Sequence, residues 1–176
     1  MNRGQIVEEG FHCRRCGIWH DELPTGYGAE APLLFYQLPA RDRGERVERD
    51  EETCIIRGDP DAYFIAANLE IPIIGEESPF VWTVWVSLSE ASMERTLEHW
   101  ETPGRENDPP CFGWLSTDLP TYPATLNLKT MVHTRPVGER PFVELEPTNH
   151  PLAVEQRDGI SWDRVRQIAE AVLHDD

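Results

Sequence analysis

The chain has 176 residues, a length typical of one domain, and can bury roughly 70% of the surface that its unfolded form exposes. Its 32 Asp and Glu residues against 16 Lys and Arg residues give a net charge of −16 at pH 7. This charge repels nucleic-acid phosphates and anionic membrane surfaces, so neither is expected as a partner, whereas a basic protein partner or a small ligand is compatible with it. The charge also favours solubility.

The sequence predicts a cytoplasmic protein. No run of apolar residues approaches the ~20 that a membrane span needs, and the polar segment Met1–Gln5 lacks the apolar core of a signal peptide. In a reducing compartment, the four cysteines are expected to be thiols or metal-bound thiolates.

The first patterned segment, residues 11–20, predicts a metal knuckle. Cys13 and Cys16 are separated by two residues, and Gly17 follows, where a left-handed backbone conformation is needed. This spacing supplies two thiolates to a tetrahedral metal ion, and His20 is placed to be a third ligand. Zinc in a structural role is the expected cofactor, and a redox-active dithiol is the alternative.

The fourth ligand must come from a distant part of the chain. We predict Cys54, because a thiolate at the start of the first sheet hairpin would tie the knuckle to the sheet. Cys111, His12, His133 and His150 are left open as alternatives. A further alternative is an open site with three protein ligands and water in the fourth position, which would make the zinc catalytic.

Alternating and β-branched runs predict the strands. Residues 53–57 and 62–68 flank a turn and predict a hairpin. Residues 80–88 are apolar on both alternating faces, which indicates a central strand covered on both sides. Residues 126–137 and 141–146 predict a second hairpin.

Two helices are predicted, one after residue 88 and one over residues 161–174. Ser87 or Ser89 can cap the first helix, and apolar residues recur at helical spacing in both. The segment 103–123 holds five prolines and is predicted to be an ordered loop over the core.

These elements predict an α+β fold with an antiparallel sheet core, flanking helices and an N-terminal zinc-knuckle-like element. We expect one domain over residues 1–176. Within it, the knuckle occupies 11–20, the sheet core with one helix occupies 53–147, and the terminal helix occupies 161–174.

The second predicted hairpin presents a polar face that could carry chemistry. Alternation places His133, Arg135 and Glu144 there together with Lys129 and Glu146. His133 could act as a general base oriented by Glu144, and Arg135 could bind an anionic group. The alternative is a solvated, salt-bridged outer face. The common nucleotide-binding and hydrolase motifs are absent, so no organic cofactor site is predicted.

Five motifs together resemble a bacterial family catalogued as domain of unknown function 2199. They are Cys13–His20, Phe80–Glu90, Phe112–Ser116, Leu126–Val137 and Pro147–Gln156. The resemblance covers nearly the whole chain. It implies a small bacterial cytosolic protein of one domain, with a Cys-x-x-Cys-Gly-x-x-His element and without an established activity. It also implies a cysteine at the strand start occupied here by Cys54, which favours that residue over Cys111.

The sequence therefore predicts a non-enzymatic, zinc-stabilised module that binds a partner or a ligand, in a regulatory or toxin-neutralising role. The alternative is a small enzyme, with its site either on the polar sheet face around His133 or at an open three-ligand zinc ion.

Overall fold

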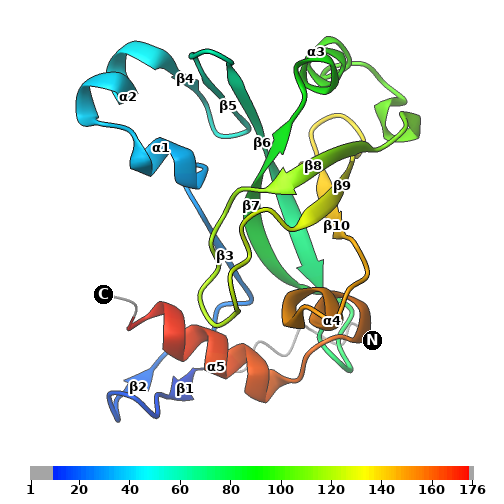
Figure 1. Cartoon of the computed structure of the whole chain (residues 1–176). Helices are drawn as coiled ribbons and strands as arrows, with labels where there is room; N and C mark the ends of the chain where they lie inside the picture. Colours follow the sequence, from blue (N-terminus) through cyan, green and yellow to red (C-terminus); the bar gives the residue numbers. More distant parts are fainter. Residues whose placement is uncertain (1–9, 175–176) are drawn as a thin grey trace.

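The computed structural model describes residues 10–174, and its main element is one eight-stranded sheet (Figure 1). The strand order is β3-β7-β8-β9-β10-β6-β5-β4, and β1 and β2 form a separate hairpin. Most pairs are antiparallel, so the predicted α+β class with an antiparallel sheet is confirmed. The strands are Phe11–His12 (β1), Trp19–His20 (β2), Gly26–Gly28 (β3), Val47–Arg49 (β4), Thr53–Ile56 (β5), Ala62–Ile71 (β6), Phe80–Leu88 (β7), Cys111–Leu115 (β8), Lys129–His133 (β9) and Phe142–Leu145 (β10).

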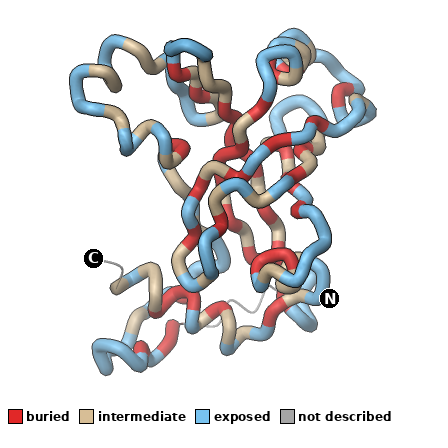
Figure 2. The backbone as a smooth tube through the Cα atoms, in the orientation of Figure 1, coloured by how far each residue is buried: buried red, intermediate tan, exposed pale blue. Residues whose placement is uncertain are grey.

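The long hairpin β6–β7 forms the centre of the sheet. Its antiparallel register runs from Tyr63 opposite Leu88 to Ile71 opposite Phe80. β7 spans the residues predicted for the central strand, and Figure 2 shows buried residues concentrated along both strands. This follows from the sequence, because β-branched and aromatic residues on both alternating faces are stable only when both faces are covered.

Five strands close into a ring. β7, β8, β9 and β10 pair in order, and β10 then meets β6 in parallel, with Phe142 opposite Asn68. The backbone N–H of Asn68 donates to the carbonyl of Pro141 at 2.8 Å, which holds this last contact. The sheet also contains β3 and β4, which lie before residue 53, where the predicted sheet core began.

The segment 103–123 is not only a loop, which corrects the prediction. It contains the short 3-10 helix η1 (Arg105–Asn107) and strand β8. Along β8, residues alternate between buried and exposed, and Gly113 lets the strand approach β7, because a Cβ there would lie 2.3 Å from a Val86 methyl group. The five prolines of this segment led to the prediction of a loop, but all of them lie outside strand β8.

Both predicted helices are present. α3 (Glu90–Glu98) begins after Ser89 and α5 (Trp162–Val172) after Ser161; in each case the serine hydroxyl accepts a backbone N–H of the first turn. The other helices are α1 (Leu33–Gln37), α2 (Ala40–Arg46) and α4 (Pro151–Asp158). Within residues 10–174, no helix is long and apolar enough to cross a membrane.

The core has two parts. The larger cluster is built around β6, β7, β8, β10, α4 and α5. A smaller cluster lies on β5, β6 and β7 and contains Cys54, Ile56, Phe64, Ala66 and Trp85. The two clusters therefore cover different faces of the central hairpin.

One buried arginine joins two loops. Arg105 is 3% exposed, and its guanidinium donates to the carbonyls of Trp100, Arg135, Pro136 and Glu139 at 2.7–3.2 Å. The guanidinium also lies over the Trp100 ring, 4.7 Å from its centroid. Because a buried charge is costly unless its donors are satisfied, these bonds fix both loops against each other.

Candidate metal centre

The knuckle (residues 11–20) forms a tight turn between two short strands. Phe11 pairs with His20 across β1 and β2. The N–H of Cys13 donates to the carbonyl of Ile18 at 3.0 Å, and the N–H of Gly17 donates back to the carbonyl of Cys13 at 2.9 Å. Gly17 has φ +70°, as predicted, so a residue with a side chain would be strained there. This turn brings the two thiols of the motif together.

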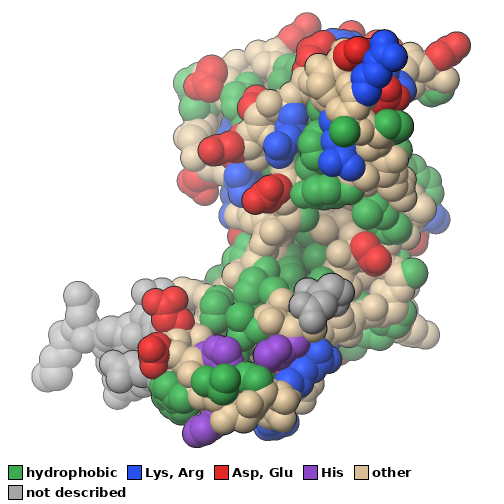
Figure 3. Space-filling view, turned by 90° about the vertical axis from the view of Figure 1, so that its left-hand side faces the viewer, with side chains coloured by type: hydrophobic (Ala, Val, Ile, Leu, Met, Phe, Trp, Pro, Cys, Tyr) green, Lys and Arg blue, Asp and Glu red, His purple; other side chains and the backbone are tan. Residues whose placement is uncertain are grey.

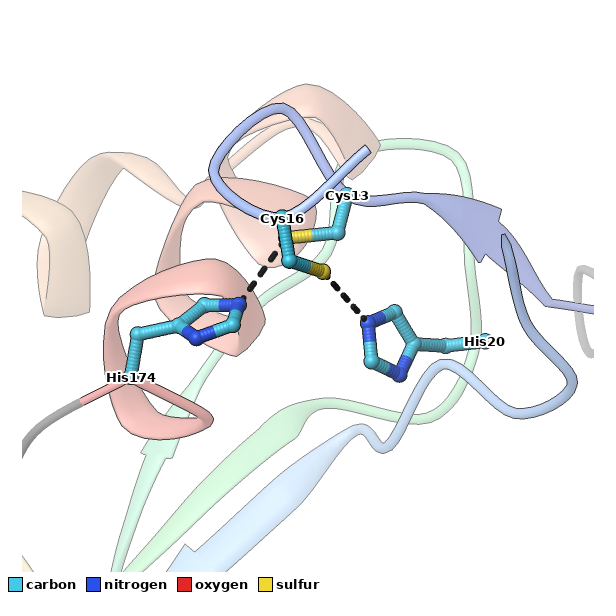
Figure 4. Close-up of side chains that lie close together, drawn as sticks. All are labelled: Cys13, Cys16, His20 and His174. Atoms are coloured by element: carbon cyan, nitrogen blue, oxygen red, sulfur yellow. Dashed lines mark hydrogen bonds between the residues drawn. The ribbon is translucent and has the colours of Figure 1, made fainter. Parts of the chain in front are cut away.

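Four potential ligands meet at one point (Figure 4). They are Cys13, Cys16, His20 and His174, and one ligand atom from each lies within 4.8 Å of all the others. The Cys16 sulfur is 3.5 Å from Nε2 of His20, and the Cys13 sulfur is 3.2 Å from Nε2 of His174. Three members were predicted from sequence, and the fourth, His174, was not.

Helix α5 carries the fourth ligand to the knuckle. Figure 1 shows this helix beside β1 and β2 at one end of the sheet, and His174 follows its last turn. The N–H of Arg14 donates to the buried carboxylate of Glu170 at 2.7 Å, and the Arg14 side chain pairs with Asp163 at 2.7 Å. Two contacts besides the candidate ligands therefore fix the knuckle on α5.

The group is only partly enclosed. Cys13 is buried, both histidines are half-buried and Cys16 is exposed. Figure 3 shows histidine side chains next to hydrophobic ones on the lower part of the molecule, where the knuckle and α5 lie. Metal could therefore reach the group from solvent.

The arrangement of the ligand atoms fits a tetrahedral ion. Zinc bonds of about 2.3 Å to sulfur and about 2.0–2.1 Å to nitrogen place tetrahedral ligand atoms roughly 3.3–3.8 Å apart. The 3.5 Å separation of Cys16 from His20 lies in this range, and the 3.2 Å separation of Cys13 from His174 lies just below it. All other pairs lie within 4.8 Å, so small side-chain rotations suffice to complete a tetrahedron.

The surroundings of Cys13 favour the thiolate, which is the metal-binding form. Burial raises the pKa of its thiol, but the backbone N–H groups of Cys16 and Arg15 and the imidazole of His174 outweigh that effect. Together they lower the pKa from 9.0 to about 6.

Cys54, predicted from sequence as the fourth ligand, is not part of this group. It lies on β5 opposite Phe64 and is fully buried in the smaller core cluster. Burial raises the pKa of its thiol to about 11, as expected of an apolar environment. Cys54 therefore acts as a small core residue.

The four residues left open as the fourth ligand also lie outside the group. His12 makes an edge contact with Trp19, and His150 caps α4 by accepting the N–H of Leu152 at 3.2 Å. The Cys111 sulfur accepts from the Arg95 guanidinium at 3.0 Å. His133 lies on β9, away from the knuckle.

The polar sheet face is assembled largely as predicted. His133 Nε2 lies 3.0 Å from a carboxylate oxygen of Glu144, and its ring stacks on Phe142 with centroids 4.6 Å apart. The Arg135 guanidinium also lies over Phe142, but it pairs with Glu70 at 2.8 Å. The three candidate residues are therefore neighbours, and the arginine already has a carboxylate partner. A catalytic role for them stays a prediction.

Comparison with known proteins gives a family but no activity. Residues 12–160 match the family described as an uncharacterized protein conserved in bacteria, domain of unknown function 2199, and the chain belongs to this family. No curated protein and no solved structure matches the chain. The matched segment includes Cys13, Cys16 and His20, whereas His174 follows it.

Proposed function

We propose that this member of the bacterial family is a non-enzymatic module that binds a partner or a ligand, and that a structural zinc ion joins its knuckle to its C-terminal helix. The main support is the group of four ligand atoms from Cys13, Cys16, His20 and His174, all within 4.8 Å. The ligands come from the two ends of the described chain, so a metal ion there would cross-link them.

The donor set favours zinc over other common metals. Two sulfurs and two imidazole nitrogens in a tetrahedral arrangement suit zinc, whereas magnesium and calcium prefer oxygen ligands. Two thiolates would also cancel the charge of a divalent ion, which lowers the cost of a partly buried site.

A structural role is favoured over a catalytic one, because four protein ligands leave no position for water or substrate. This argues against the open three-ligand alternative, which requires that the fourth ligand be missing. The enzyme alternative on the sheet face is weakened by the pairing of Arg135 with Glu70, since the guanidinium would have to leave a carboxylate before it could bind a substrate anion.

Metal analysis tests the proposal. Protein purified without an affinity tag should contain about one zinc per chain, as expected for a closed four-ligand site. Cys16→Ser should lose the metal, and because Cys16 is exposed, its replacement should create no core cavity. Cys54→Ser should retain the metal despite some loss of stability.

Two results would count against the proposal. The first is wild-type protein without zinc, after purification in the absence of chelators. The second is zinc lost from Cys54→Ser but kept in Cys16→Ser, which would return the fourth ligand to the sheet.

A further inference from the structure

The outer face of strands β8, β9 and β10 borders a cavity of about 520 Å³, called here the sheet groove. This volume is in the range of small-molecule sites, roughly 300–1,000 Å³. Its lining includes the apolar side chains of Phe112 and Met131 and the charged side chains of Lys129, Glu144, Glu146 and Arg157.

One exposed aromatic residue, Phe112, lines this groove, and a second, Trp114, packs against it. Phe112 is 47% exposed and Trp114 is 41% exposed, and their rings make an edge contact with centroids 5.1 Å apart. Phe112 lies opposite Met131 and Trp114 opposite Lys129 in the β8–β9 register. Neighbouring large apolar side chains left open on a sheet face are typical of a binding surface.

The charges at the groove are balanced. Lys129 and Arg157 are positive, Glu144 and Glu146 are negative, and Lys129 pairs with Glu146 at 3.6 Å. The chain as a whole has a net charge of −16, but the four charged side chains at the groove sum to zero. The groove itself therefore attracts neither an anionic nor a cationic ligand. The groove is therefore electrostatically matched to an uncharged ligand.

The groove also disfavours a purely apolar ligand and an extended peptide. An apolar ligand would remove water from four charged side chains without replacing their hydrogen bonds. An extended peptide binds by adding a strand to a free sheet edge, but β8 and β9 have strand neighbours on both sides. β10 meets β6 only at Phe142, and beyond it the Gln156 side chain bonds to the carbonyl of Val143 and the N–H of Leu145. Recognition must therefore come from side chains, namely the exposed ring of Phe112 and the hydrogen-bonding groups around it.

We propose that the sheet groove binds an uncharged carbohydrate. The C–H face of a sugar ring would stack on Phe112, whose ring is held edge-on by Trp114, and the sugar hydroxyls would bond to Glu144, Lys129 and Arg157. A sugar ring has both an apolar face and neutral hydroxyl groups. This inference rests on the proposed function only in that the protein is a ligand-binding module; it does not depend on the metal.

A glycan array carrying both neutral and acidic glycans tests the inference, followed by calorimetric titration of the best neutral binder. We expect wild type to bind neutral glycans. Phe112→Ala should bind roughly tenfold more weakly, as for an aromatic residue central to an interface, and Trp114→Ala should also lose affinity. Tyr36→Ala is the matched control, because Tyr36 is equally exposed, at 47%, but lies on α1; it should bind like wild type.

Three results would overturn the inference: no neutral glycan bound, acidic glycans bound in preference, or Phe112→Ala with wild-type affinity. Thermal unfolding of each variant shows whether it is folded, and its zinc content is measured on the same sample. Zinc without glycan binding would reject only the carbohydrate site, whereas glycan binding without zinc would reject only the proposed metal.

Discussion

Replacing the proposed fourth ligand, His174→Ala, tests the candidate metal centre at the residue that the sequence analysis did not identify. Zinc binds to structural sites in small peptides with roughly 10–16 kcal/mol at pH 7, so each of four ligands contributes roughly 2.5–4 kcal/mol. Loss of one ligand should therefore weaken zinc binding by about 10²–10³-fold. His174 is half-buried at the end of α5, so the metal-free variant should lose little stability, within about 0.5 kcal/mol.

The weaker zinc binding of His174→Ala should also lower its thermal stability. The measurement is made with free zinc buffered at a concentration that saturates wild type but not the variant. Zinc stabilises the folded state in proportion to the logarithm of its affinity, and for a chain of this size roughly 2–4 °C of midpoint corresponds to 1 kcal/mol. We therefore expect the midpoint of His174→Ala to fall by about 5–15 °C with zinc and to match wild type without it.

Competition with a fluorescent zinc chelator measures the affinity, and circular dichroism measures the midpoint. His12→Ala is the control, since His12 lies in the same hairpin but outside the group of ligands. Wild-type zinc affinity in His174→Ala would refute the assignment, as would an equal loss in His12→Ala.

Three further predictions concern other residues. Because burial raises the pKa of Cys54 to about 11, iodoacetamide at about pH 8 should leave Cys54 unmodified in the folded protein. The exposed Cys16 should react once a chelator has removed any bound metal, and peptide mass spectrometry distinguishes the two cysteines. Arg105→Met deprives four backbone carbonyls of their donor, so the free energy of unfolding in urea should fall by about 3 kcal/mol or more. Burial raises the pKa of Asp50, but hydrogen bonds from the two backbone N–H groups and the hydroxyl of the following turn outweigh it and hold the pKa below 3.8. Its stabilisation is present above pH 3.8 and is lost as the pH falls through the lowered value, so Asp50→Asn should flatten the acid side of a plot of midpoint against pH.

Each of these predictions has a clear contrary result. Rapid alkylation of Cys54 in the folded protein would contradict its burial. Arg41→Met is the control for Arg105, because the Arg41 side chain is 81% exposed and should change the free energy of unfolding by no more than about 0.5 kcal/mol. Equal effects of the two substitutions would reject the structural role of Arg105. An unchanged acid slope in Asp50→Asn would reject the third prediction.

Local patterns predicted the central elements of the fold. β7 was predicted with correct bounds because an unbroken run of β-branched and aromatic residues fills most of it, and both hairpins were found because turn residues separate alternating runs. β8 was missed because Gly113, which the close approach to β7 requires, is itself a weak strand former. The parallel pairing of β3 with β7 joins segments more than 50 residues apart, and no local pattern indicates it.

The same division between local and distant signals holds at the metal centre. Cys13, Cys16 and His20 lie within eight residues, so their spacing alone predicts a shared site. His174 lies 161 residues beyond Cys13, and a histidine at the end of an amphipathic helix usually interacts with the helix dipole. Cys54 lies outside the group because it packs in the smaller core cluster, and sequence does not specify which face of a sheet meets a distant turn.

The separation of the ligands along the chain also orders events during synthesis on the ribosome. Three ligands leave the ribosome early, but His174 lies 161 residues beyond the first of them, Cys13, and follows it roughly 10–30 s later at usual elongation rates. During that interval a zinc ion could be held only in part, with a position open to exchange. The proposed zinc cross-link between the knuckle and α5 forms only when α5 has been made and has docked. A chain interrupted before His174 would lack this cross-link and should be the form that proteases degrade first.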